Sequence, residues 1–219
     1  QFRGEVRTSA GHALFQACRA GLADIATLMV DAFPGEARAC AGRDFVEACR
    51  EGHLKAAWVL VEAFPEETRG AAGRALHEAC FHGRGRVATT LVEEFPDEAR
   101  AALARVDGDA HLAPLHGACR TGLLRVARGL LEQFPQEASA ALGLPDEAGR
   151  TPLAWACENE HEDLVKMLLA RLPGSELQHP FFGEPEPDMV SDELPEMLEP
   201  GSRETLAHAG YRLPGSHRA

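Results

Sequence analysis

The chain has 219 residues, of which 45% are hydrophobic and 26% are charged, so it can bury a substantial core in one or two domains. No apolar run approaches the roughly 20 residues that a membrane-spanning helix requires, so the sequence predicts no membrane span. A formal net charge of −12 argues against sequence-independent nucleic-acid binding, which depends on clustered Lys and Arg. Basic or neutral protein surfaces are the partners that this charge favours.

Two dipeptides recur along the chain after an N-terminal extension of residues 1–10. Ala-Cys occurs at 17–18, 48–49, 79–80, 118–119 and 156–157, at intervals of 31, 31, 39 and 38 residues. Phe-Pro follows at 33–34, 64–65, 95–96 and 134–135, and Leu172-Pro173 is a degenerate fifth pair. Because both landmarks keep the same interval, the sequence predicts five tandem repeats in residues 11–174, at about 11–41, 42–72, 73–110, 111–148 and 149–174.

The fourth repeat shows the content expected of each unit, which is a pair of helices. Leu115, Ala118 and Cys119 form one apolar stripe on a short first helix. Gly122 then supplies the left-handed residue that commonly ends a helix. Apolar residues again recur at spacings of three and four within 126–134, which predicts a second helix ending at Phe-Pro.

The ends of the helices carry their own signals. The terminating glycine recurs at positions 21, 52, 83 and 122, but the fifth repeat has Glu160 there, so we expect its first helix to end less sharply. The Phe-Pro pairs are interpreted as boundaries between successive repeats. The phenylalanine closes the apolar stripe, and the proline disfavours helical geometry in the residue before it while it begins the next helical turn.

The connectors that follow Phe-Pro differ in length. The first two, EARACAGRD and EETRGAAGR, are alanine-rich and carry an acid just after the proline, which favours a helical turn over a strand. The longer connectors contain turn residues at Asp107-Gly108 and Pro145-Asp146. Any projecting loop or short β-hairpin is expected at those two places.

Residues 149–173, GRTPLAWACENEHEDLVKMLLARLP, resemble an ankyrin repeat, whose pattern is Gly-x-Thr-Pro-Leu-His-x-Ala-Ala, then Gly-His, then Val-Val-x-Leu-Leu-Leu. Residues 113–135, APLHGACRTGLLRVARGLLEQFP, match the same frame, whereas the first three repeats diverge and keep mainly its register. The resemblance implies an all-α solenoid of stacked helix-turn-helix pairs, here with short or absent β-hairpin fingers. It also implies a non-catalytic protein–protein interaction module.

Cysteine and histidine positions follow the repeat register. Five of the six cysteines occupy the second small position of the ankyrin Ala-Ala pair, which favours structural packing, and Cys40 is the candidate exposed thiol. Stacked helices lie about 8–10 Å apart, whereas a disulfide requires α-carbons within about 7 Å, so neighbouring repeats should not be crosslinked. The resemblance places His77 and His116 where an imidazole bonds the connecting backbone.

Signatures of catalysis and of metal binding are missing from the sequence. It contains no nucleophile elbow, glycine-rich phosphate loop, HExxH or Cys-x-x-Cys, so we expect no enzyme activity, metal, cofactor or small-molecule substrate. Reduced, buried cysteines favour an intracellular protein, in the cytoplasm or inside an organelle. The first residue is Gln1 rather than Met, which predicts a processed or partial product with any targeting segment outside these residues.

Function is therefore expected on the surface, and a solenoid binds through an extended concave face. In the ankyrin family that face takes in the residues after the Ala-Ala pair. Here these positions form a ladder of eight residues, Arg19, Arg50, Phe81, His82, Arg120, Thr121, Glu158 and Asn159. Arginine and aromatic residues are enriched at binding hot spots, so the ladder is the predicted partner-binding site, with incidental solvated residues as the alternative.

The remaining residues, 175–219, form an acidic, proline-rich tail that is predicted to be extended. Its apolar anchors are Phe181, Phe182, Met189, Leu194, Met197, Leu198 and Tyr211. Their spacing favours a segment that docks on another surface, and a plain disordered extension is the alternative. Two functional hypotheses follow. One is a scaffold or adaptor that binds a protein through its concave face and loops, and the other is an accessory subunit of a large assembly with the tail docked on neighbouring subunits.

Overall fold

The computed structural model describes residues 2–104 and 113–171, with side chains from Ser9 onward except that of Ala104. The described residues form twelve α-helices and no strand, which confirms the all-α prediction. The helices are α1 (Phe2–Arg19), α2 (Ala23–Ala32), α3 (Pro34–Glu51), α4 (Leu54–Ala63), α5 (Pro65–Phe81), α6 (Gly85–Glu94), α7 (Pro96–Ala104), α8 (Pro114–Arg120), α9 (Leu124–Gln133), α10 (Pro135–Leu142), α11 (Pro152–Glu158) and α12 (Glu162–Leu169).

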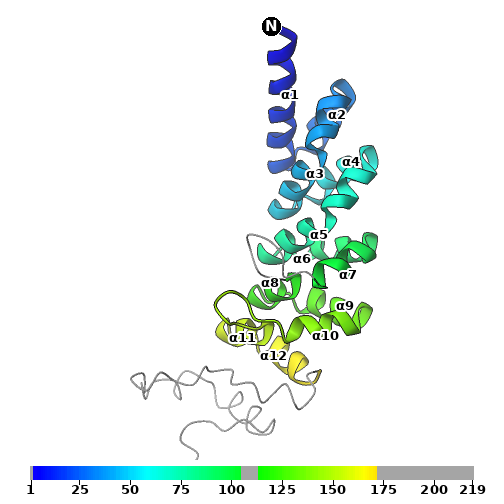
Figure 1. The fold of residues 1–219 in the computed structure, drawn as a ribbon. Coiled ribbons are helices and arrows are strands. Elements are labelled where there is room, and N and C mark those ends of the chain that lie inside the picture. The colour runs from blue at the N-terminus through cyan, green and yellow to red at the C-terminus, as the bar shows by residue number, and fades with distance from the viewer. Residues whose placement is uncertain (1, 105–112, 172–219) are drawn as a thin grey trace, which may run out of the picture.

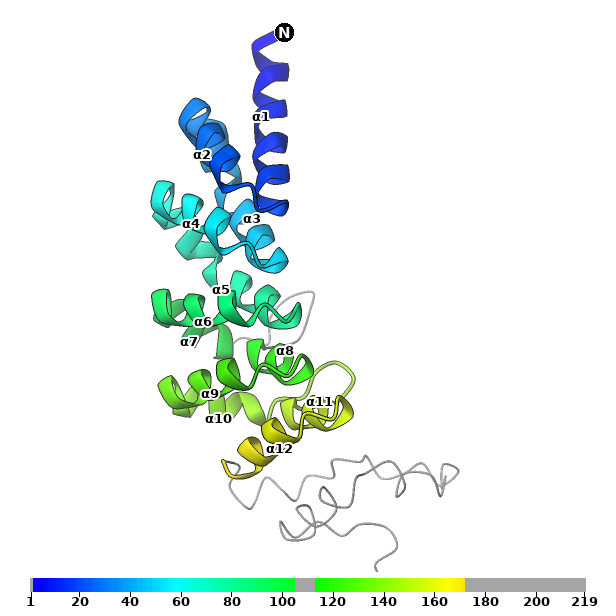
Figure 2. The same ribbon diagram turned by 180° about the vertical axis from the view of Figure 1, so that it is seen from behind.

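Five helix pairs are stacked along one axis (Figure 1). The first helices α1, α3, α5, α8 and α11 pack one on the next and form one column. The second helices lie beside them in a second column, where α4 packs on α2, α9 on α6 and α12 on α9 (Figure 2). Equivalent positions of successive repeats are therefore brought next to each other.

The connectors are helical, and this extends the prediction of a helical turn. A proline is the first residue of α3, α5, α7 and α10, where its missing N–H leaves no helical bond unmade. In the first two connectors the helix runs on into the next repeat, so α3 has 18 residues and α5 has 17. The separate helices α7 and α10 pack together, and α7 packs on α5, where a finger would otherwise project. Asp107-Gly108 lies outside the described residues.

The prediction that the fifth repeat would end its first helix less sharply is wrong. Glu160 adopts a positive φ of 58°, close to the 74° of Gly122 at the equivalent position. The closing hydrogen bonds are also the same, because His161 N donates to Ala156 O at 2.9 Å, as Leu123 N donates to Ala118 O at 2.9 Å. The His161 side chain also reaches the preceding repeat, so contacts made by stacking offset the strain of a left-handed glutamate.

The core combines small residues, alanine and cysteine, with larger leucine, valine and phenylalanine side chains. Cys18, Cys49, Cys80 and Cys119 are fully buried and reduced, which agrees with a packing role. The phenylalanines that close the second helices, at positions 64, 95 and 134, are also buried. Alanine and cysteine let the backbones of neighbouring repeats come close, and the rigid stack that results fixes the positions of the first-helix ends.

Candidate functional site

The eight ladder residues lie where the five first helices end. Arg19, Phe81, Arg120 and Glu158 are the last residues of α1, α5, α8 and α11, and Arg50 is the last but one of α3. His82, Thr121 and Asn159 each follow directly after a helix. Because the first helices form one column, the stack brings these chain-distant positions into one row, as the repeat register predicts.

Acidic side chains accompany the arginines of the first repeats. Arg50 Nη2 lies 2.7 Å from Glu47 Oε1 and 3.2 Å from Glu51 Oε1. Arg19 is more open, since its side chain is 56% exposed and its Nε lies 4.0 Å from the same Glu47 oxygen. Exposed pairs of this length contribute little to stability, so the Arg19 guanidinium is available to a partner.

The centre of the ladder is a cation–aromatic cluster, which we define as Phe81, Arg120, Arg150 and Trp155. The Arg120 guanidinium carbon lies 3.6 Å from the centre of the Phe81 ring and 5.8 Å from that of Trp155, whose other arginine neighbour, Arg150, lies at 3.7 Å. Arg120 Nη2 also donates to the Phe81 carbonyl oxygen at 2.7 Å. Both rings are half-buried, and a guanidinium over an aromatic face is attracted by the ring quadrupole.

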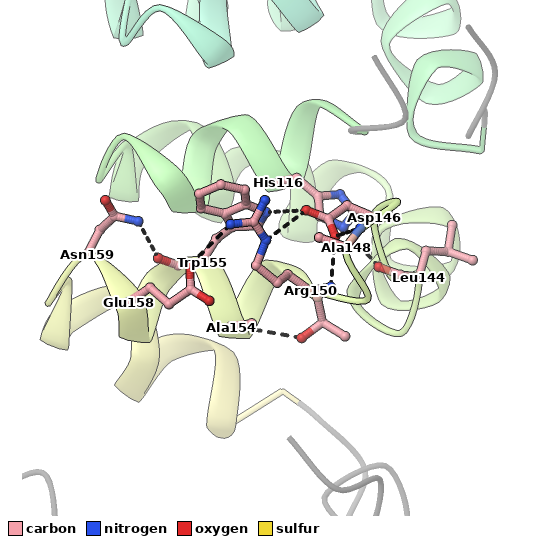
Figure 3. A network of polar contacts seen from close by, with 10 residues as sticks. His116, Leu144, Asp146, Ala148, Arg150, Ala154, Trp155, Glu158 and Asn159 are labelled. Atoms are coloured by element: carbon pink, nitrogen blue, oxygen red, sulfur yellow. Dashed lines mark hydrogen bonds and ion pairs between the residues drawn. The ribbon is translucent and has the colours of Figure 1, made fainter. Parts of the chain in front are cut away.

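Asp146 fixes the C-terminal half of this cluster (Figure 3). Its buried carboxylate accepts hydrogen bonds from Ala148 N at 2.9 Å, Arg150 N at 2.8 Å, Arg150 Nε at 3.2 Å and Trp155 Nε1 at 3.1 Å. Burial opposes ionisation of Asp146, but these hydrogen bonds and the charge of Arg150 outweigh it and lower the pKa of the carboxyl. The loop that carries Pro145-Asp146 is thus a tight turn that positions an arginine and a tryptophan.

His116 bonds the connecting backbone, as the family resemblance implies. Its Nε2 lies 2.9 Å from the carbonyl oxygen of Leu144 in the fourth connector. Burial is the main influence on this imidazole and lowers its pKa, so the ring is neutral at pH 7. His77 is half-buried at the equivalent position, and its ring stacks on that of Phe81 with centroids 6.1 Å apart.

Side chains at the loop between the two helices reach back to the preceding repeat. Arg84 Nε donates to Arg50 O at 2.9 Å, Thr121 Oγ1 donates to Cys80 O at 2.9 Å, and His161 Nε2 lies 3.2 Å from Arg120 O. Sequence reasoning missed these contacts, together with Asp146, Arg150 and Trp155. The three backward contacts join residues that are 34 to 41 positions apart in the sequence, and no local pattern predicts such pairs.

The remaining thiols and predicted sites are less specialised. Cys40 is half-buried and lines an open groove between α1 and α3 with Gly11, His12, Phe15, Glu36, Ala39 and Arg43. No group of three or more His, Cys, Asp and Glu in residues 2–104 and 113–171 could hold a metal ion. Within those ranges no helix is long and apolar enough to cross a membrane. The seven tail anchors lie outside the described residues.

Comparison with known protein families gives a match over the C-terminal repeats. The family model for ankyrin repeats, which spans three copies, matches residues 76–179. These residues include the whole cation–aromatic cluster. No curated protein matches the chain.

Proposed function

From the premise that this chain belongs to the ankyrin-repeat family, whose repeats are generally non-catalytic protein–protein interaction modules, we propose that it is an adaptor that binds a protein through the ladder. The contact is centred on the cation–aromatic cluster. The proposal assigns no catalytic role to any residue of the ladder.

The hydrogen bonds that hold the arginines of the cluster are the observation that supports this proposal. Arg120 is held by Phe81 O and Arg150 by Asp146, while the Phe81 and Trp155 rings stay half-exposed. Side chains that are already fixed lose little conformational entropy when a partner binds. Arginine, tryptophan and other aromatic residues are also the types that dominate binding energy at protein interfaces.

The charge balance around the cluster adds a second argument. Burial and the positive charge of neighbouring Arg150 lower the pKa of Arg120, which still remains charged near neutral pH. Arg150 has acidic neighbours in Asp146 and, 3.6 Å away, Glu158. A row that offers both signs beside aromatic faces suits a polar protein surface with some apolar side chains, and complementarity of this kind selects partners.

The test leaves Arg120 in place, because its side chain also bonds the preceding repeat. The ladder variant combines Arg150→Ala of the cluster with Arg19→Ala, His82→Ala and Asn159→Ala in the full chain. The matched control combines Arg125→Ala and Arg128→Ala, which change exposed side chains of α9 in the second column.

Affinity for a protein that co-purifies with the full chain would be measured by calorimetry. We expect the ladder variant to bind at least about tenfold more weakly and the control to bind within about twofold of the original chain. Equal affinities for the ladder variant and the original chain would refute the proposal.

A further inference from the structure

One side of α2 exposes three large apolar side chains. Leu22, Ile25 and Leu28 are 48%, 45% and 66% exposed, and they are the large hydrophobic residues that stand open in the described part of the chain. They are spaced by three residues from the start of the helix, so they share one side of it. We call these three residues the α2 stripe.

The position of Ile25 is covered in all the later repeats. The residues equivalent to Ile25 are Ala56, Val87, Val126 and Leu164, with exposures of 0%, 2%, 3% and 1%. Each of these four repeats has another repeat before it, and first helices pack on first helices along the whole stack. Residues equivalent to Leu22 make the backward contacts described above, as Arg84 and His161 do. In the first repeat the α2 stripe therefore lies on the side that, in the later repeats, packs against the preceding repeat.

The first helix of the same repeat is open on the same side. Ala13 of α1 is exposed, whereas its equivalents Asp44, Ala75, Pro114 and Pro152 are all buried. The uncovered surface thus spans both helices of the first repeat, as an interface between repeats does.

The segment ahead of the first repeat resembles a connector between repeats, which is the third observation. Residues 2–7 read FRGEVR, and residues 33–38 read FPGEAR, so four of six residues are identical at the repeat interval of 31. The two segments begin helices of equal length, since α1 and α3 each have 18 residues. In α3 this segment is the connector that leads from one repeat to the next.

We propose that the α2 stripe and Ala13 form a stacking surface for a further ankyrin-type helix pair. The second helix of that pair covers Ile25 with apolar side chains, as the other repeats cover its equivalents. The inference rests on burial and register and does not depend on the proposed binding role of the ladder.

The test supplies such a helix pair in register. A copy of residues 33–63 replaces Gln1 of the full chain, so that an alanine precedes Phe2 as Ala63 precedes Phe64. We expect one cooperative unfolding transition at higher urea concentration, and amide exchange in α2 at least about tenfold slower than in the original chain.

Ile25→Ser with Leu28→Ser provides the matched comparison. The double change should shift the urea midpoint little in the original chain, where both side chains are exposed, and markedly in the extended chain, where Ile25 is buried and Leu28 is half-buried, as their equivalents are. A copy that unfolds separately and leaves exchange in α2 unchanged would overturn the proposal. So would a dimer of the original chain that the double change converts to monomer, because a second copy would then cover the stripe.

Discussion

Replacing Gly122 by Ala should destabilise the fold more than the same change at Gly83. Both glycines follow a first helix with nearly the same backbone geometry, φ +74° and φ +70°. A methyl group at Gly122 would lie 2.8 Å from Cε1 of His161 in the next repeat, whereas at Gly83 its nearest neighbour would be Thr121 Cβ at 3.7 Å, an ordinary contact. The pair of variants therefore separates the cost of the backbone from the cost of the contact between repeats.

The expected magnitudes follow from these distances. A left-handed alanine costs about 1–2 kcal/mol, and this applies to both variants. At Gly122 the imidazole of His161 must also move away and give up its 3.2 Å contact with the Arg120 carbonyl oxygen, which adds about 1 kcal/mol. We expect Gly122→Ala to lower the free energy of unfolding by about 2–3 kcal/mol and Gly83→Ala by about 1–2 kcal/mol.

Urea unfolding followed by circular dichroism measures both values, and His161→Ala completes a double-mutant cycle. Without the imidazole, Gly122→Ala should cost no more than Gly83→Ala does. If the two glycine variants are equally stable, or if removing His161 leaves the cost of Gly122→Ala unchanged, the backward contact does not constrain this position.

Three further outcomes are expected. Asp146→Ala should cost about 2–3 kcal/mol at pH 7 because the Trp155 N–H and two backbone N–H groups lose their acceptor. Since the folded-state pKa of Asp146 is lowered, this difference should be present above the unfolded pKa of about 4 and shrink as pH falls through the folded value; urea midpoints at pH 3 and pH 7 check it. Asp44→Ala should instead stabilise the fold by about 1 kcal/mol at pH 7 and have no effect at pH 3, because burial raises the pKa of this carboxyl and its Oδ2 has no hydrogen-bond partner; the same pair of midpoints decides it. Burial raises the pKa of Cys80 to about 12, so iodoacetamide at pH 8 should label Cys40 first and Cys80 only after unfolding, as peptide mass spectrometry would reveal; equal labelling of the two thiols in the folded chain would contradict the packing role.

The repeat landmarks predicted the helices because they are local signals. Proline at 34, 65, 96 and 135 begins a helix in each case, and glycine at 21, 52, 83 and 122 follows one with positive φ. The same local rule failed at Glu160, where packing against the preceding repeat imposes the left-handed geometry on a residue that does not favour it.

Only part of the candidate site could be predicted from the sequence. Register placed Arg19, Phe81 and Arg120 in one row, and the stack of first helices brings their positions together. Register did not predict that Arg120 donates a hydrogen bond to the Phe81 carbonyl oxygen. Nor did it predict that Asp146, in a neighbouring loop, accepts hydrogen bonds from Arg150 and Trp155. At Pro145-Asp146 the sequence predicted a projecting loop or a short β-hairpin.

The sequence alone therefore determined the repeat period, the helix pairs and the order of the ladder, because proline, glycine and apolar spacing act on the backbone within one or two turns. Tertiary structure decided which ladder side chains form hydrogen bonds and which are exposed to solvent. It also decided which end of the stack has an uncovered face. Ile25 shows the difference, since an apolar residue at its position is expected in every repeat, but its exposure depends on a neighbour 31 residues away in the repeat register. The burial of a position depends on the neighbouring repeats, so the sequence of one repeat alone does not predict it.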